Sequence, residues 1–482
     1  MSQTVTKLSR TDLLLERIRS GADMSRWDQF RLTWLLAIPS MVAQIATILM
    51  NYIDASMVGH LGADESASVG LVSTSIWLMA GLTNSVSMGF SVQVAHLIGA
   101  GDREGARNVL RQSLVATFVI GLIIGTVGLM ISGALPSWLR GQPDIQADAS
   151  LYFAIFSLLI PVLQLDMLGA AMLRCSGNIK FPSLLYACMC LLDVLFNFLL
   201  IYPTRVVRFN ESLSLTIPGA DLGVGGAALG TALAEVVTMF IMLYYLVFRS
   251  KELRLWNGGL GHTSLFLPTR TVLRRAVHIG LPMALQHIAM CSAQILITTF
   301  VAPLGKFAIA ANSFGVTAES ICYMPGYGIS EAATTLVGQS IGAGRNPLAR
   351  RFAYIAVGSG IFIMSVMGIF LYIGAPVMMA LFSPVQEIIT LGTDALRIEA
   401  FAEPMFAAAI VTYGVCVGAG DTLKPALMNL GSMWGVRITL CWLLASQYGL
   451  NGVWFAMATE LTFRGIIFLF RLRSKAWLKT LA

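Results

Sequence analysis

A single carboxylate, Asp54, lies in a long apolar stretch, "ILMNYIDASMVGHLG" (48–62). A second carboxylate, Asp193, is followed four residues later by Asn197 in "LLDVLFNFLL". Residues at i and i+4 share one face of a helix, so this carboxylate and this amide are expected to lie side by side. Their oxygens are hard ligands for a cation, and a carboxylate withdrawn from water can also take up a proton. The spacing indicates a cation or proton site and leaves H⁺ and Na⁺ both open.

The chain that must position these residues is too apolar for a water-soluble domain. Its 482 residues are 56% hydrophobic and only 12% charged, whereas soluble domains carry roughly 25% charged residues. Residues 1–31 are polar and basic and lack the apolar core of a cleavable signal peptide. Apolar stretches of about 20 residues, long enough to cross a bilayer, predict an all-α polytopic membrane protein. The twelve predicted spans are 33–56, 68–97, 112–135, 150–173, 182–202, 225–248, 277–301, 311–341, 353–373, 394–418, 426–446 and 450–470.

A carboxylate inside a span is costly, because burying a charge in lipid takes several kcal/mol. Asp54 and Asp193 are therefore predicted to be functional. For Asp54, which lies near one end of its span, a hydrated residue at headgroup level is the competing interpretation.

The basic residues predict the orientation of the chain in the membrane. The two tails and the even-numbered connections hold 25 Lys and Arg residues, whereas the odd-numbered connections hold four. By the positive-inside rule, both termini are expected in the cytoplasm. The net charge of +7 then reports topology and contact with anionic lipid rather than nucleic-acid binding. Residues 7–20 are expected to form either a basic amphipathic helix on the inner leaflet or a disordered tail.

The sequence contains a repeat with an offset of 243 residues. Ile38-Pro39 falls on Leu281-Pro282, and "SGNIKFP" (176–182) falls on "AGDTLKP" (419–425). The repeat predicts two parallel six-helix lobes with a pseudo-twofold axis along the membrane normal and a cleft that opens by alternating access. Asp54 falls on Ile297, so only the first lobe carries this acid. The predicted division is a basic N-terminal segment 1–31, an N-lobe 32–248, a cytoplasmic linker 249–276, a C-lobe 277–470 and a C-terminal tail 471–482.

Two "GAGD" tetrapeptides, 99–102 and 418–421, look like phosphate-binding loops at first sight. Neither has a Walker pattern or a preceding strand. They are predicted to end helices, where glycine suits a left-handed turn.

Several stretches resemble one transporter family. "IPSMVAQIATILMNYIDASMVGHLG", "IGAGDREGAR", "LVGQSIGAGR" and the paired "SGNIKFP" and "GAGDTLKP" are similar to motifs of the multidrug and toxic compound extrusion (MATE) transporters, in the NorM/DinF-like bacterial branches. The resemblance implies a twelve-helix antiporter of the bacterial inner membrane. Such an antiporter exports amphipathic, often cationic compounds while H⁺ or Na⁺ runs inward, and it needs no other cofactor.

The resemblance also implies the coupling site. Asp54 matches the first-span aspartate of these transporters, and Thr231 matches a hydroxyl that lines the same pocket. In the family the fifth span commonly has Asn first and Asp four residues later, whereas this chain has Asp193 and then Asn197. The predicted coupling site is therefore Asp54, Asp193, Asn197 and Thr231, with the cation geometry left open.

The C-lobe departs from the Na⁺-coupled NorM pattern. NorM-type transporters have an acidic residue in span 7 and another in span 10, and these positions align with Met290 and Ala408 here. A C-lobe Na⁺ site of that design is therefore not expected. Three other acids, Asp166, Glu235 and Glu460, are expected to be structural and paired with a neighbouring helix.

Drug contact is expected from polar or soft residues in the spans that line the cleft, with ordinary helix packing as the competing interpretation for each. The candidates are Gln44, Tyr52, Gln164, Gln286, His287, Gln294, Glu319, Tyr323 and Met324. Pro39 and Pro282 lie in the first span of each lobe and are predicted to permit a bend.

Two other functions are less favoured. A lipid-precursor flippase of a related superfamily usually has fourteen spans and a strongly cationic cavity, whereas the spans here carry only Arg397, Arg437 and Arg464. A membrane-embedded enzyme would need a metal, nucleophile or cofactor motif, and the sequence offers none. Its seven cysteines have no metal-ligand spacing beyond Cys188-Met-Cys190, which lies inside an apolar stretch and is expected to pack as small hydrophobic residues. Because two lobes of one chain already form a cleft, a monomer is expected.

Overall fold

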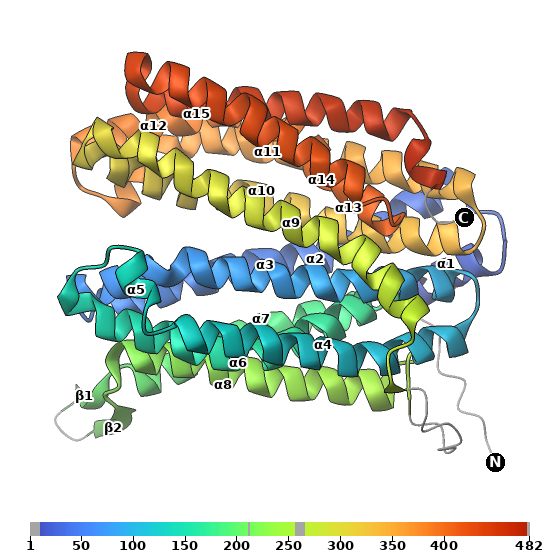
Figure 1. The fold of residues 1–482 in the computed structure, drawn as a ribbon, viewed down its shortest axis with the longest axis horizontal. Helices are drawn as coiled ribbons and strands as arrows, with labels where there is room; N and C mark the ends of the chain where they lie inside the picture. Colours follow the sequence, from blue (N-terminus) through green and yellow to red (C-terminus); the bar gives the residue numbers. More distant parts are fainter. Residues whose placement is uncertain (1–9, 211–212, 256–265, 480–482) are drawn as a thin grey trace.

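The computed structural model describes residues 10–210, 213–255 and 266–479. Long helices run roughly side by side in two stacked halves, the first built from the N-terminal half of the chain and the second from the C-terminal half (Figure 1). Both chain termini lie at one end of these helices, here named the termini-bearing end (Figure 1). The predicted all-α polytopic architecture is confirmed.

The N-lobe consists of six long helices and a small hairpin that the sequence interpretation did not foresee. The hairpin pairs β1 (Pro203–Asn210) with β2 (Leu213–Ala220) in antiparallel fashion. It lies at the end opposite the termini (Figure 1), here named the hairpin end. The helices are α2 (Arg26–Gly59), α3 (Ala63–Gly99), α4 (Arg103–Ile131), α6 (Pro143–Cys175), α7 (Lys180–Leu200) and α8 (Gly223–Tyr244), with the short α5 (Leu135–Trp138) and the π-helical turn η1 (Tyr245–Arg249).

The C-lobe repeats this pattern without a described strand. Its elements are α9 (Arg270–Val301), η3 (Ala302–Leu304), α10 (Lys306–Gly342), α11 (Asn346–Phe382), α12 (Gln386–Ala400), α13 (Glu403–Gly418), α14 (Leu423–Leu430), η4 (Gly431–Arg437), α15 (Ile438–Arg473) and η5 (Ala476–Lys479). Helix α9 begins seven residues before the predicted lobe boundary at 277. Arg270, Arg274 and Arg275 therefore belong to a helix rather than to the linker, as the good helix propensity of arginine permits.

Within the described residues, nine helices are long and apolar enough to cross a membrane, or ten when α12 and α13 are taken as one span bent by 58°. The segment Leu423–Arg473 is 51 residues long, about twice what a bilayer needs. At Gly449 its backbone leaves the helical region (φ 59°, ψ −138°), which divides it between the predicted spans 426–446 and 450–470. The candidate spans do not include α10. When α10 is added, all or part of a helix overlaps each of the twelve predicted spans.

The packing of the helices follows the repeat. Helix α2 packs against α10 and α3 against α9 between the lobes, while α3–α6 and α10–α13 are matching pairs within them. A Cβ at Gly89 of α3 would lie 2.5 Å from Ala276 O of α9, so glycine permits this close approach. The "GAGD" prediction is confirmed: Gly101 and Gly420 have φ of 80° and 77° just after α3 and α13 end.

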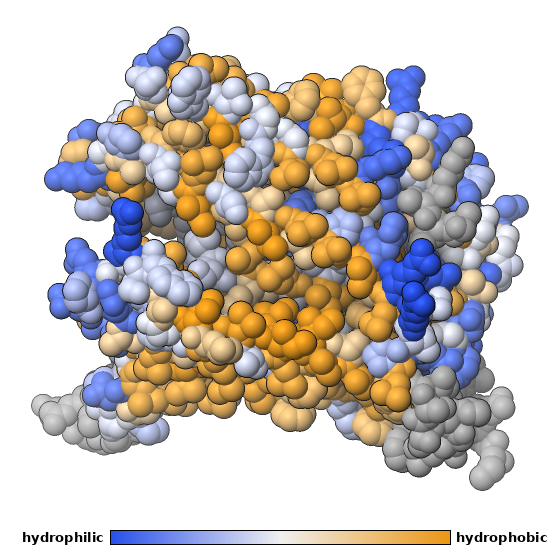
Figure 2. Space-filling view, in the orientation of Figure 1, coloured by the Kyte–Doolittle hydropathy of each residue, from blue (hydrophilic) through white to orange (hydrophobic). Residues whose placement is uncertain are grey.

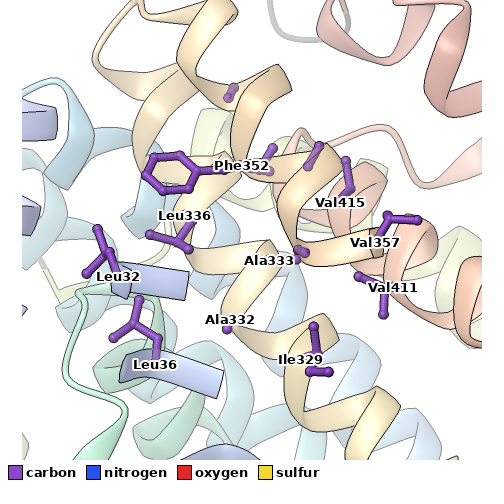
Figure 3. Packing of buried hydrophobic residues seen from close by; sticks show 14 of the residues in the cluster. Leu32, Leu36, Ile329, Ala332, Ala333, Leu336, Phe352, Val357, Val411 and Val415 are labelled. Carbon is purple, nitrogen blue, oxygen red and sulfur yellow. The ribbon is translucent and has the colours of Figure 1, made fainter. Parts of the chain in front are cut away.

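A buried apolar cluster joins the lobes near the termini-bearing end. Leu32 and Leu36 of α2 face Ala332 and Leu336 of α10, with Phe352 of α11 nearby (Figure 3). On the outside, hydrophobic surface covers the middle of the helices and hydrophilic surface gathers toward the two ends (Figure 2). This distribution fits a molecule surrounded by lipid.

The N-terminal segment forms a helix, α1 (Arg10–Arg19), so the helical alternative is the one observed. The expectation that its apolar face lies on the leaflet is wrong. Leu14, Leu15 and Ile18 are at most 5% exposed and belong to the cluster that joins the lobes. An amphipathic face can be buried in protein or in lipid, and here protein supplies the apolar surface. Residues 7–9 of the predicted segment lie outside the described residues.

Candidate functional site

Three helices of the N-lobe bring the four predicted coupling residues together. The Asn197 amide on α7 donates a hydrogen bond to Asp54 Oδ1 on α2 (2.9 Å). The same Nδ2 donates to Asp193 Oδ2 (3.1 Å), which confirms the predicted i, i+4 contact on α7. The Thr231 side chain on α8 adjoins the Asp193 carboxyl, and its hydroxyl donates to Ala227 O (3.3 Å). We call these four residues the N-lobe cluster.

The N-lobe cluster holds two carboxyl groups with no cation to balance them. Asp193 and Asn197 are fully buried, and Asp54 is half-buried. Within the described part of the chain, no Lys, Arg or His forms an ion pair with either aspartate. Asp193 Oδ1 and Asn197 Oδ1 also have no hydrogen-bond partner. Because unpaired charge and unpartnered oxygens are costly away from water, this arrangement suits the uptake of a proton or a hard cation.

Two neighbours shape the N-lobe cluster. A Cβ at Gly230 of α8 would lie 2.0 Å from Asn197 Oδ1, so glycine provides the space that the amide occupies. Tyr152 of α6 interacts electrostatically with both Asp54 and Asp193. The sequence interpretation missed Tyr152, because it lies on a different helix and no spacing connects it to the acids. The described residues contain no group of three or more His, Cys, Asp or Glu side chains placed to hold a metal ion. An ion here would therefore need amide and hydroxyl oxygens as ligands as well.

The C-lobe contains a buried acid whose charge is balanced. Glu460 of α15 accepts hydrogen bonds from Arg437 of η4 and from Arg464 of its own helix, each with a shortest N–O distance of 2.7 Å. Ser432 donates a further hydrogen bond to the same carboxylate. The predicted structural pairing of Glu460 is thus confirmed.

Other acids are buried without such partners. Glu399 and Glu403, on either side of the break between α12 and α13, are 0% exposed, and all four carboxylate oxygens lack hydrogen-bond partners. In the N-lobe, both oxygens of Asp166 and Glu235 Oε2 are likewise unpartnered. No hydrogen bond to either Asp166 oxygen or to Glu235 Oε2 is observed, so the expected pairing of Glu235 is not seen at that atom. Asp166 nevertheless interacts electrostatically with Tyr186 of the neighbouring α7 and with Arg174 of its own helix.

Glu319 does not lie where a drug-attracting residue in the cleft was expected. It is only 5% exposed and interacts electrostatically with Arg437 inside the C-lobe. Its other electrostatic neighbours include Glu399 of α12 and Glu403 of α13, which belong to the same lobe.

Three of the cleft candidates contact the opposite lobe. Gln44 of α2 donates to Glu331 of α10 (3.2 Å), and Tyr52 of α2 donates to Thr317 O of α10 (2.5 Å). A His287 ring nitrogen on α9 lies 3.2 Å from a backbone oxygen of α3. The adjacent Gln286 instead contacts the sulfur of Met290 in its own helix (3.6 Å).

Glu331 of α10 contacts two helices of the N-lobe. Ser40 and Gln44 of α2 donate to its carboxylate, and Arg174 of α6 lies 3.7 Å from it. The sequence alone did not indicate that Glu331 lies where the lobes meet, because this position depends on the packing of α2, α6 and α10.

The remaining candidates are not all at the interface. Gln164 is fully buried, and its amide donates to Thr83 O (3.1 Å) and Ser87 Oγ (2.9 Å) of α3, so this structure gives it a packing position within the N-lobe. The other three candidates, Gln294, Tyr323 and Met324, are half-buried. Pro39 and Pro282 lie inside the continuous helices α2 and α9.

Known proteins resemble this chain in sequence and in structure over both lobes. A probable multidrug resistance protein NorM of Thermotoga maritima is 24% identical over 446 residues, which is 92% of each chain. A solved structure described as the outward-facing conformation of a multidrug resistance MATE family transporter matches with a TM-score of 0.85 and 22% identity, covering 97% of this chain and 99% of that one. A MATE protein in the bent conformation matches with a TM-score of 0.82 and 21% identity over 98% of each chain. The MatE family profile matches residues 39–199 and again 282–443, the second match beginning 243 residues after the first. The chain therefore belongs to the MatE family.

Proposed function

We propose that this protein is a cation-coupled multidrug efflux antiporter of the bacterial inner membrane, with both termini in the cytoplasm. It exports amphipathic, often cationic compounds by alternating access while H⁺ or Na⁺ enters through the N-lobe cluster. No other cofactor takes part, and one chain is sufficient because its two lobes form the transport path. The names of relatives such as NorM and MdtK, described as multidrug resistance proteins, support the substrate class.

One observation carries the coupling role: no basic side chain among the described residues balances the carboxylates of the Asp54–Asn197–Asp193 contact, in which Asp193 and Asn197 are buried. Two adjacent carboxylates cannot both stay ionised in a water-poor site without a large free-energy cost. Binding one proton, or Na⁺ with help from the Asn197 and Thr231 oxygens, removes that cost. The cluster is therefore suited to alternate between a loaded and an unloaded state.

Bending of α2 is the proposed link between ion loading and drug release. Asp54 and Pro39 lie on the same helix, and a proline inside a helix removes one backbone hydrogen bond. A MATE protein of the same fold is described in a bent conformation. A bend at Pro39 would move Asp54 relative to α7 and reshape the space between the lobes.

The competing flippase function is less well supported. Arg437 and Arg464 are buried and balanced by Glu460, and Arg397 lies over the Tyr372 ring at 5.4 Å. Only Arg397 of the three arginines inside the predicted spans is left without a carboxylate partner among the described residues, and one arginine is too few for the strongly cationic cavity that a flippase of this kind would need.

The test is gradient-driven uptake of ethidium into everted membrane vesicles. An imposed proton gradient or an imposed Na⁺ gradient is expected to drive uptake by the wild type, which identifies the ion. Asp54→Asn and Asp193→Asn are each expected to abolish this dependence, because only one carboxylate remains at the cluster.

Asp148→Asn is the matched control. Asp148 is an exposed aspartate of α6 in the same lobe, and its substitution removes the same charge without touching the cluster. Undiminished gradient-driven uptake in both cluster variants would refute the coupling role. Failure of the wild type to transport under either gradient would refute antiport.

A further inference from the structure

A groove of about 900 Å³ lies at the termini-bearing end between α9 and the start of α14. Three arginines from the first two turns of α9, Arg270, Arg274 and Arg275, line it together with His278. We call them the α9 arginines. Arg270, Arg274 and His278 are spaced at i, i+4 and i+8, which places them on one face of the helix.

The α9 arginines are exposed and carry unbalanced positive charge. Within the described residues, no Asp or Glu forms an ion pair with any of them. Some other arginines at this end are paired, for example Arg103 with Glu252 and Arg471 with Asp421. The groove thus concentrates cationic donors for which the described residues supply no carboxylate partner.

The other wall of the groove is apolar and equally exposed. Val277 and Leu281 are 55% and 52% exposed and follow the arginines toward the middle of α9, and Leu423, the first residue of α14, is 51% exposed and also lines the groove. Figure 2 shows a strongly hydrophilic patch over the start of α9, and this patch borders directly on hydrophobic surface. An anionic head with an apolar tail is the ligand that matches both walls.

We propose that this groove binds one anionic phospholipid. The phosphodiester contacts the α9 arginines, whose planar guanidinium groups match phosphate oxygens, and an acyl chain lies along Val277, Leu281 and Leu423. Basic pockets between transmembrane helices are a recognised form of headgroup recognition. The bound lipid would bridge α9 and α14, which already touch where the Thr422 hydroxyl donates to His278 O (3.3 Å).

The experiment measures thermal unfolding of the purified full-length protein in a neutral detergent while dioctanoyl-phosphatidylglycerol is added. The lipid is expected to raise the midpoint of the wild type in a saturable way. The variant Arg270→Gln/Arg274→Gln/Arg275→Gln is expected to lose this response. Dioctanoyl-phosphatidylcholine and inorganic phosphate, at equal concentrations, are expected to have no effect on either protein.

A second triple variant controls for net charge. Arg351→Gln/Arg473→Gln/Lys475→Gln removes three exposed positive charges from α11 and from the end of α15, and its response is expected to match that of the wild type. If both triple variants lose the response equally, binding is diffuse and the groove is refuted. An equal midpoint shift with inorganic phosphate would likewise overturn the assignment to a lipid.

Single substitutions keep the test decisive if the triple variant does not fold. Arg274→Gln is expected to weaken the apparent affinity for phosphatidylglycerol by about fivefold, the contribution of one basic side chain near an anionic lipid. Arg351→Gln is expected to leave it unchanged. Equal affinities for the two single variants would contradict the proposal.

Discussion

The carboxylates inside the helices differ in whether a cation balances their charge. Glu460 lies between Arg437 and Arg464, whereas the buried Asp193 has only the Asn197 amide and its carboxyl and hydroxyl neighbours. Removing one partner of a buried ion pair leaves an uncompensated charge. Neutralising a carboxylate that has no cationic partner instead removes an uncompensated charge. The same change, acid to amide, should therefore have opposite consequences at the two sites.

Glu460→Gln is expected to lower the free energy of unfolding by about 3–5 kcal/mol, because two buried arginines lose their counter-charge. Asp193→Asn is expected to keep the stability within about 1 kcal/mol of the wild type, since the amide can still accept from Asn197. Thermal unfolding of the purified variants in one detergent measures both effects. Equal destabilisation by the two substitutions would contradict the distinction between a structural and a loadable carboxylate.

At the scale of elements, α1 connects the two lobes at the termini-bearing end. Arg19 donates to Glu252 Oε1 (2.6 Å) and Ser176 O (2.9 Å) on the N-lobe side and to Gln339 Oε1 of α10 (3.3 Å) in the C-lobe. Arg345 of the C-lobe donates to the carbonyl of Arg17 (2.8 Å). Opening of the lobes at this end must break these contacts, so α1 is placed to oppose it.

Arg19→Gln is expected to make the termini-bearing end open more often. Cys175, which is only 3% exposed and whose carbonyl accepts from the Gln339 amide (2.8 Å), reports on this opening. In a variant with Cys175 as its single cysteine, Arg19→Gln should speed labelling by N-ethylmaleimide about fivefold, the effect of roughly 1 kcal/mol on the opening equilibrium.

Arg17→Gln is the control for this experiment, because it removes the same charge from α1. The Arg17 side chain pairs only with Asp28 of the N-lobe among the described residues (3.1 Å), so labelling should stay at the unmodified rate. Similar acceleration by both substitutions would mean that the net charge of α1, and not its bridge between the lobes, sets the opening.

At the scale of the whole molecule, much of the architecture follows from the repeat, and the exceptions have physical causes. The 243-residue offset predicted the paired lobes, and the i, i+4 spacing predicted the contact of Asp193 with Asn197. The docking of α1 could not be predicted, because its apolar residues fit lipid and protein equally well. Glu319 was misplaced because a periodic sequence gives the face of a helix but not which neighbour covers it. The approach of Tyr152 to the aspartates depends on the packing of α6, which no local spacing encodes.

The repeat also supplies the control for the proposed bend. Pro39 of α2 and Pro282 of α9 are equivalent under the offset, yet only α2 carries an acid of the cluster, since Asp54 falls on Ile297. If bending of α2 connects ion loading to drug release, straightening α2 by Pro39→Ala should slow gradient-driven ethidium uptake by about five- to thirty-fold, corresponding to 1–2 kcal/mol. Pro282→Ala should slow it clearly less, because α9 holds no ion ligand of the cluster.

Both variants should fold, because alanine restores the backbone donor that proline lacks; equal thermal midpoints would verify this. Equal slowing of uptake would assign the prolines to a general rocking of both lobes, and unchanged uptake in Pro39→Ala would remove the bend from the mechanism.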